Sequence, residues 1–192
     1  GRLMVHRIWE DVPADAAAAD RIAAALGLPP VIARLLCQRG FTTPESAECF
    51  LAPDLSQLHD PFLLVDMRPA VDRLLAAIAR QESIVIHGDY DVDGITATVI
   101  LRRALELLGA NVTHFVPDRM RDGYGLQPAG IERLHAAGAR VIVSVDCGIR
   151  AAQAAARARD LGVDLIITDH HEPEGALPPA LAVINPKRGD CA

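Results

Sequence analysis

The sequence has no long hydrophobic run, no recognisable leader and almost no lysine. Every apolar run falls short of the roughly 20 residues needed to span a bilayer, and no signal-peptide pattern opens the chain. Lys187 is the only lysine among the nineteen basic residues, which together with abundant alanine indicates GC-rich coding rather than a functional choice. The first two absences predict a cytoplasmic protein.

Paired cysteines and nucleotide-binding loops are also missing. Cys37, Cys49, Cys147 and Cys191 form no C-x-x-C pair, which argues against a disulfide framework and a structural zinc cluster. The pattern around Cys37 and Cys49 is helical, and it predicts that both are buried. Neither a G-x-G-x-x-G nor a Walker-type glycine loop follows any strand candidate. The familiar nucleotide-binding loops are therefore absent from the sequence.

Size and charge set further bounds. The 192 residues, 51% of them hydrophobic, suffice for one sizeable α/β domain and a smaller element. The net charge of −6 argues against a general nucleic-acid coat. It does not exclude an enzyme that binds a phosphate backbone locally, because clustered acids at a metal site make the sum negative by themselves.

The first third of the chain predicts a small helical extension and a connector, together residues 1–66. Helical patterns cover residues 15–26, 30–38 and 44–50, and turn residues without periodicity fill 51–66. Gly27 follows the first helix at the position where a left-handed cap is expected. These helices are too short to form a large core, so we expect a lead-in to the main domain.

Residues 67–192 predict one α/β domain. After a helical pattern at 67–81, short strands alternate with helices of about a dozen residues. The predicted strands are 84–87, 111–116, 141–145, 164–168 and 181–184. The predicted helices between them are 95–108, 127–137 and 150–161. Continuous apolar strands of this kind lie in parallel sheets covered on both faces, so we expect a doubly wound, mainly parallel sheet of about five strands.

An acidic stretch follows the first predicted strand. In IVIHGDYDVDG, residues 84–94, His87, Asp89, Asp91 and Asp93 occupy alternate positions. Carboxylates this close raise one another's pKa and destabilise a compact loop unless a cation neutralises them. The sequence therefore predicts a divalent-metal site here. Read singly, Asp89 or Asp91 could equally be a helix N-cap, and His87 a satisfied core residue.

Two more strand ends carry the same chemistry. Asp146 follows the strand at 141–145, and Asp169, His170 and His171 follow the strand at 164–168. The carboxyl ends of parallel strands meet at one edge of a sheet, where ligands bind. Oxygen and imidazole donors without clustered thiols select Mn²⁺ or Mg²⁺. So many donors predict two ions, with Asp146 as the bridging carboxylate.

Some neighbours of these donors have other expected roles. His170 and His171 are adjacent, and we expect their side chains to point apart, one toward metal and one toward substrate. Asp169 is expected to orient a histidine. Cys147 has no evident base beside it, so we expect a packed thiol.

Basic residues after the second and last strands are candidates for substrate contact. Arg119, Arg121 and Tyr124 lie in RMRDGYGL, and Lys187 and Arg188 lie near the end of the chain. Two arginines with an aromatic residue and two glycines suit a loop that contacts phosphates and bases. A solvated basic loop anchored by Tyr124 explains the same residues nearly as well.

With these motifs the sequence resembles the DHH phosphoesterase family. Asp169-His170-His171 matches the family's namesake motif, HGDYDVDG its first motif, and VDCG at 145–148 its second. RDGYGL and INPKR resemble features of the family's RecJ-type exonucleases, which degrade single-stranded DNA from the 5′ end using Mn²⁺ or Mg²⁺. The resemblance implies a hydrolase of DNA repair and recombination that releases 5′-mononucleotides. It also implies single-stranded DNA as partner, with a single-strand-binding protein and a helicase as further partners.

The resemblance assigns roles by position. It implies that Asp91, Asp93, Asp146 and His170 ligate metal and that His171 contacts the scissile phosphate. His87 and Asp89 are implied as further ligands or neighbours of the first motif. The family has one more aspartate ligand on a later strand, which we expect beyond residue 192, in a longer enzyme of which this chain is a fragment.

Two other readings use the same fold. One is a pyrophosphatase or a phosphodiesterase of small nucleotides, against which the lead-in and RDGYGL argue. The other is a replication or repair scaffold without catalysis, against which the intact acidic and histidine residues argue. A substrate panel and a metal-binding measurement would separate them.

Overall fold

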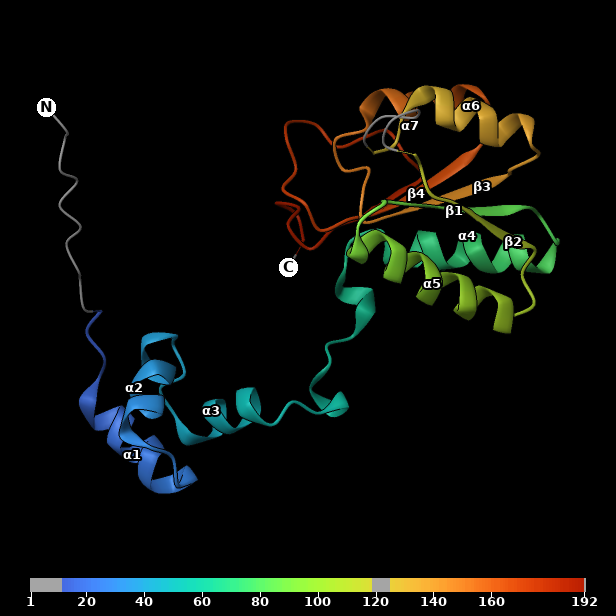
Figure 1. Cartoon of the computed structure of the whole chain (residues 1–192). Coiled ribbons are helices and arrows are strands. Elements are labelled where there is room, and N and C mark those ends of the chain that lie inside the picture. Colours follow the sequence, from blue (N-terminus) through green and yellow to red (C-terminus); the bar gives the residue numbers. More distant parts are fainter. Residues whose placement is uncertain (1–11, 119–124, 192) are drawn as a thin grey trace, which may run out of the picture. The chain divides into compact units, whose positions relative to one another are not determined.

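The structure is a computed structural model, and it describes residues 12–118 and 125–191. The chain divides into two compact units, Gly1–His59 and Asp60–Ala192. Figure 1 shows the elements of each unit. Within the described ranges, no helix is both long and apolar enough to cross a membrane.

The first unit consists of short capped helices. Helix α1 spans Ala16–Leu26, α2 spans Pro30–Gln38 and α3 spans Pro44–Leu51, followed by the 3₁₀ turn η1 at Leu55–Gln57. These bounds confirm the three predicted helices, and Gly27 ends α1 in the left-handed conformation, with φ +64°. The core of this unit is a small cluster of buried residues. Its members are Ala18, Ala19, Ile22, Ala33, Leu36, Cys37 and Ala47.

The two cysteines of this unit differ in burial. Cys37 is buried as predicted, but Cys49 is exposed, so the prediction for Cys49 is wrong. Helix α3 buries only Ala47. Two residues along a helix turn a side chain by about 200°, so Cys49 lies on the opposite face.

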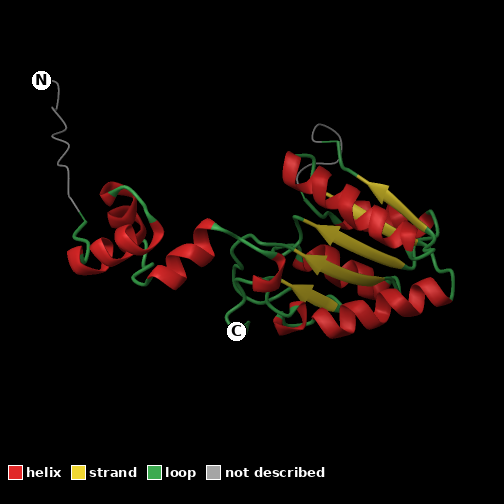
Figure 2. Cartoon of the chain, turned by 90° about the horizontal axis from the view of Figure 1, so that it is seen from below, coloured by secondary structure: helices red, strands yellow, loops and turns green. Residues whose placement is uncertain are grey.

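The second unit is built on a parallel sheet. Its strands are β1 (Ile84–Gly88), β2 (Val112–Phe115), β3 (Val141–Val145), β4 (Asp164–Thr168) and β5 (Ala182–Ile184). Their order is β2-β1-β3-β4-β5, and every pair is parallel. Figure 2 shows the arrowheads meeting at one edge. All five predicted strands are confirmed, and their ends lie within about one residue of the predicted bounds.

Helices cover both faces of this sheet. Helices α4 (Met67–Ala79) and α5 (Val92–Leu107) lie on one face, and α6 (Pro128–Ala136) and α7 (Ala152–Asp160) lie on the other (Figure 1). A 3₁₀ turn, η2 (Pro61–Leu63), precedes α4. Alternate strand residues pack against the helices on opposite faces of the sheet, and this confirms the doubly wound prediction. Ile84 and Ile86 pack toward α4 and α5, whereas Val85 packs toward α6 and α7.

The strand order creates a switch point beside β1. From β1 the chain crosses to β2 on one side, and from β2 it crosses back to β3 on the other side of β1. In open parallel sheets, ligands bind beyond the carboxyl ends at such a point. The ends of β1 and β3, with Asp91 and Asp146 just beyond them, therefore occupy the favoured position for a site.

Candidate active site

The end of β1 leads directly into α5 through two aspartates. Asp89 is buried, and its Oδ1 accepts a hydrogen bond from the Tyr90 backbone N at 2.7 Å. Asp91 is the N-cap of α5 and accepts from the Gly94 N at 3.0 Å. The helix thus begins at Val92, three residues before the predicted start, because the acidic stretch supplies its own cap. Asp93 is exposed in the first turn.

Two glycines let α5 approach this strand end closely. A Cβ on Gly94 would lie 2.6 Å from the backbone N and O of Asp89, and one on Gly88 would lie 2.1 Å from Thr98 Oγ1. Neither glycine has a positive φ. At Gly94 the backbone of α5 meets the backbone of Asp89, whereas at Gly88 the closest atom is the hydroxyl of Thr98. These contacts fix where Asp91 and Asp93 emerge.

At the end of β3, Asp146 adopts an unusual backbone conformation. Its φ is +61°, and its N donates to the Thr168 carbonyl of β4 at 3.0 Å. Few residues other than glycine occupy this region, although aspartate is among the more tolerant. The conformation turns the carboxylate back over the sheet edge, where its Oδ1 lies 2.8 Å from His170 Nε2.

Asp91 and Asp146 are neighbouring carboxylates whose pKa values are shifted in opposite directions. Burial raises the pKa of Asp146, and the charge of Asp91 raises it further. The hydrogen bond from the Gly94 N lowers the pKa of Asp91. Two carboxylates from adjacent strands thus face one another, an arrangement that a divalent cation stabilises.

At the end of β4, Asp169 organises the two histidines. This buried carboxylate accepts from the backbone N of His170 at 2.7 Å and of Ile149 at 2.9 Å, and its Oδ1 lies 2.7 Å from His171 Nδ1. Burial raises the pKa of Asp169, but the bonds from Ile149, His171 and His170 outweigh it and lower the pKa below its usual value. The expected role of Asp169 in orienting a histidine matches this geometry.

The two histidine rings lie side by side. Their centroids are 4.7 Å apart with an interplanar angle of 38°, so the prediction that they point apart is wrong. His170 is held by Asp146 and His171 by Asp169, and both carboxylates converge on the same sheet edge. Ligand atoms of Asp146, His170 and His171 all lie within 4.8 Å of one another, close enough to share one ion.

The donor set fits a hard divalent ion rather than a thiolate zinc site. Carboxylate oxygens and imidazole nitrogens face the edge, as Mn²⁺ and Mg²⁺ require. Cys147 is buried, and burial raises the pKa of its thiol well above the ordinary range, so the thiol stays protonated. Its Sγ lies 3.8 Å from His87 Nδ1, which supports the packed-thiol prediction.

His87 sits deeper than the other predicted ligands. It is 1% exposed, and its ring centroid lies 5.3 Å from that of Phe115 on β2. Alternation along β1 places it with Val85, on the face covered by α6 and α7. Its role as a ligand, like that of Asp89, remains a prediction.

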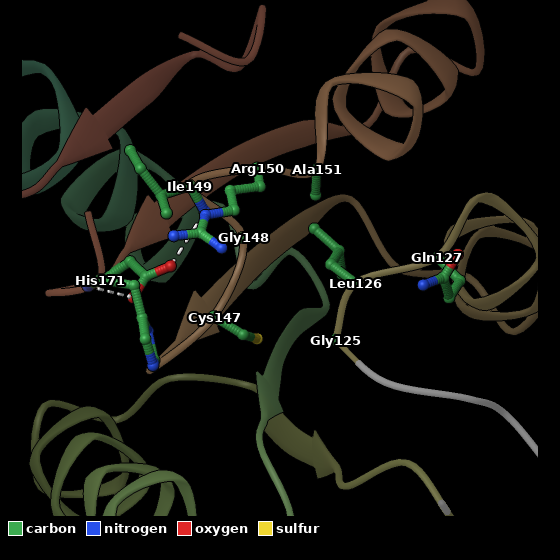
Figure 3. A pocket seen from close by; sticks show the side chains of 10 residues that line it. Gly125, Leu126, Gln127, Cys147, Gly148, Ile149, Arg150, Ala151 and His171 are labelled. Atoms are coloured by element: carbon green, nitrogen blue, oxygen red, sulfur yellow. Dashed lines mark hydrogen bonds and ion pairs between the residues drawn. The ribbon is translucent and has the colours of Figure 1, made fainter. Parts of the chain in front are cut away.

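Cavities flank the histidines on both sides. One, of about 310 Å³, is lined by Gly125, Leu126, Gln127, Gly148, Arg150 and His171, among others (Figure 3). The other, of about 380 Å³, lies against α5 and includes Asp93, Ile100, Asp146 and His170. A ligand held at the histidines would thus have open space on either side.

The predicted substrate residues are placed unevenly. Lys187 Nζ lies 3.0 Å from Glu172 Oε1, next to the histidines in sequence. Arg188 is buried, with guanidinium nitrogens 2.7 Å from Asp66 Oδ2 and from Asp190 Oδ2, so this side chain is engaged within the fold. Arg119, Arg121 and Tyr124 lie outside the described residues.

Arg150 is a site residue that the sequence pattern did not reveal. It follows Asp146 closely in sequence, at the turn before α7, and lines the cavity of Figure 3. Arg150 lies two residues beyond the VDCG motif at 145–148, so a strand-end prediction extended by two residues would have included it.

Comparisons with known proteins identify relatives. The family model "DHH family, N-terminal domain" matches residues 83–192. The single-stranded-DNA-specific exonuclease RecJ of Bacillus subtilis (strain 168) is 40% identical over 183 residues, covering 95% of this chain and 23% of that protein. RecJ of Escherichia coli (strain K12) is 39% identical over 165 residues, covering 85% of this chain and 28% of that protein. This chain therefore spans about a quarter of the length of these relatives.

Solved structures agree with the sequence relatives. RecJ in complex with Mn²⁺ from Thermus thermophilus aligns with a TM-score of 0.72 at 32% identity, covering 91% of this chain and 24% of that one. Exonuclease RecJ bound to manganese aligns with a TM-score of 0.64 at 35% identity, covering 70% of this chain and 34% of that one. Since the family model covers more than half of the residues and the strand ends carry its motifs, the chain belongs to the DHH family.

Proposed function

We propose that this chain is the metal-binding catalytic part of an exonuclease that hydrolyses single-stranded DNA from its 5′ end to 5′-mononucleotides. The convergence of Asp146, His170 and His171 within 4.8 Å carries the proposal, with the Asp91 carboxylate beside them. The names of the relatives support single-stranded DNA as the substrate, and their bound Mn²⁺ and Mg²⁺ support the metals.

Each side chain has a distinct task in this proposal. Asp91, Asp93, Asp146 and His170 would hold divalent metal. His87 and Asp89 would complete or support this ligand set. A bound divalent ion supplies a water of lowered pKa and neutralises phosphate oxygens. Asp169 fixes His171 through Nδ1, which leaves Nε2 as the nitrogen that meets the scissile phosphate.

The cellular setting follows from the resemblance alone. We propose a role in DNA repair and recombination, with a single-strand-binding protein and a helicase presenting the strand. The aspartates of the acidic edge contribute most of the net charge of −6. This charge does not exclude a polyanionic substrate, because bound divalent ions would offset it locally.

Asparagine substitutions in the full-length protein test this function. Asp91→Asn and Asp146→Asn keep the backbone contacts, since asparagine caps helices and tolerates a positive φ. Both should lower Mn²⁺-dependent release of 5′-mononucleotides from single-stranded DNA by at least about a hundredfold. Asp160→Asn, on the exposed end of α7, is the matched control.

The substrate panel includes duplex DNA, pyrophosphate and a cyclic dinucleotide, and Mn²⁺ binding is followed by calorimetry. Undiminished digestion by both site variants would overturn the assignment. Preference for pyrophosphate or the cyclic dinucleotide would indicate an enzyme that acts on small phosphates. Absence of Mn²⁺ binding would indicate a scaffold without catalysis.

A further inference from the structure

The cavity of Figure 3 adjoins the histidines and carries a cation of its own. It has a volume of about 310 Å³, and His171 and Asp169 form part of its wall. Figure 3 shows Arg150 and His171 on one side and Gln127 across from them. Leu126 and Ile149 are buried and make an apolar floor. A pocket of this size, with an apolar floor and an arginine in its wall, suits a nucleotide-sized ligand.

Arg150 is held in the cavity wall by replaceable contacts. Its Nη1 lies 3.0 Å from Glu174 Oε1, and its Nε donates to the Glu172 carbonyl at 3.2 Å. The side chains of Arg150 and Glu174 are 53% and 69% exposed. An ion pair this exposed contributes little to stability. An incoming phosphate can therefore replace the Glu174 carboxylate at small cost.

The local charge explains why such a cation is needed. Asp91, Asp93, Asp146 and Asp169 concentrate negative charge at the sheet edge. Metal at that edge neutralises one phosphate, but the adjacent phosphate of a strand meets the same acids without an ion of its own. Guanidinium groups bind phosphate through paired, charge-assisted hydrogen bonds, so Arg150 matches this demand.

We propose that this cavity, the Arg150 pocket, binds the nucleotide adjoining the scissile bond and that Arg150 contacts its phosphodiester. This inference rests on the proposed function and assigns a substrate residue outside the family motifs. Glu174 acts as a placeholder that keeps the guanidinium oriented until the strand arrives. The two side chains therefore affect DNA binding in opposite directions.

The first experiment measures the contribution of the Arg150 charge in the full-length protein. Arg150→Ala should raise KM for an oligodeoxythymidine about tenfold, because a charge-assisted contact to phosphate is lost, with little change in kcat. In EDTA, which prevents cleavage, the slope of log Kd against log salt should fall by about 0.7, as expected for one lost contact to single-stranded DNA. Arg150→Lys should restore the slope.

Arg157→Ala is the matched control, because this arginine of α7 pairs with Glu132 at 2.7 Å and does not line the pocket. It should leave KM and the salt slope unchanged. A purely structural role for Arg150 would lower the melting temperature in Arg150→Ala without altering the salt slope, and that result would overturn the inference.

The second experiment tests the placeholder. Glu174→Ala should lower Kd for the oligodeoxythymidine by about two- to fivefold, because the competing carboxylate is gone. In the Arg150→Ala background the same substitution should have no effect, since the coupling runs through the guanidinium. Equal effects in both backgrounds would mean general charge repulsion and would refute the placeholder role.

The two levels of hypothesis fail separately. If the full-length protein leaves single-stranded DNA intact, the proposed function is refuted. If the protein is active but Arg150→Ala changes neither KM nor the salt slope, only the proposed role of the Arg150 pocket is refuted.

Discussion

Asp169 joins the third strand end to the rest of the site. Its two oxygens contact the backbone of Ile149 after β3 and both residues of the histidine pair after β4. One buried carboxylate thus sets the turn that carries His170 and His171 and orients the ring of His171. Several N–H donors stabilise its negative charge.

The depressed pKa of Asp169 predicts a pH-dependent contribution to stability. A lowered folded pKa contributes stability that is present above the unfolded value, near 3.8, and is lost as pH falls through the folded pKa. Asp169→Asn should therefore lower the free energy of unfolding by about 1–2 kcal/mol at pH 7, with a smaller difference at pH 3. Urea denaturation in EDTA at both pH values measures this.

Asp160→Asn, an exposed substitution, is the control for Asp169→Asn and should change stability little at either pH. A difference between wild type and Asp169→Asn that stays constant from pH 7 to pH 3 would contradict the prediction.

At the residue scale, the sequence predicted which side chains meet but not how they are oriented. Asp91, Asp146 and His170 were predictable because parallel strands end at one edge and polar residues follow each end. The ring directions of His170 and His171 depend on Asp169 and Asp146, partners that sequence spacing cannot rank. Arg150 escaped notice because a lone arginine before a helix has no pattern.

Among the elements, α5 does the most to place the site. Its N-cap is a predicted ligand, and its first turn lies against the backbone that follows β1. Because the contact at Gly94 is with backbone N and O of Asp89, no side-chain rearrangement can make room for a methyl group there.

A pair of glycine-to-alanine substitutions tests this packing. Gly94→Ala should destabilise the protein by about 1–3 kcal/mol, because the added Cβ would lie 2.6 Å from Asp89 backbone atoms. Gly130→Ala, in α6, meets no atom within 4 Å and should stabilise by about 0.4–1 kcal/mol. Urea denaturation of both variants measures whether each substitution lowers or raises the free energy of unfolding. Destabilisation by both to the same extent would show that helical glycines matter here for another reason.

Most helices and strands were predictable because the sequence clearly marks where they begin and end. Apolar runs gave the strands, and glycines after the helices gave their ends. The start of α5 was placed three residues late because Asp91 was assigned to a metal loop, whereas it also caps the helix. The turns η1 and η2 were missed because three residues carry no periodicity.

At the scale of the whole molecule, the two units differ in the size of their cores. The clusters on both faces of the sheet draw all their buried residues from the second unit. The described residues of the first unit form a small cluster that includes four alanines. A unit of about 60 residues with so small a core is marginal in stability.

This difference predicts separable unfolding. The chain should lose the first unit at lower urea concentration than the second, and residues 60–192 alone should unfold cooperatively with the midpoint of the later transition. Circular dichroism of both chains in urea measures the transitions. A large shift of that midpoint on removal of residues 1–59 would contradict independent stability.

The fold class was predictable at this scale because alternating strands and helices admit few arrangements. The strand order was not predictable, because the apolar runs do not indicate on which side of β1 the chain returns. The switch point beside β1, which makes β1 and β3 direct neighbours, emerges only from the assembled sheet.

The positive φ of Asp146 bears on how this protein can evolve. At that position the backbone alone favours glycine, so neutral drift toward a more robust fold would discard the carboxylate. Aspartate at position 146 therefore places a carboxylate at the sheet edge at the expense of backbone stability. A single Asp146→Gly substitution would therefore relieve the backbone strain and remove the carboxylate at the same time.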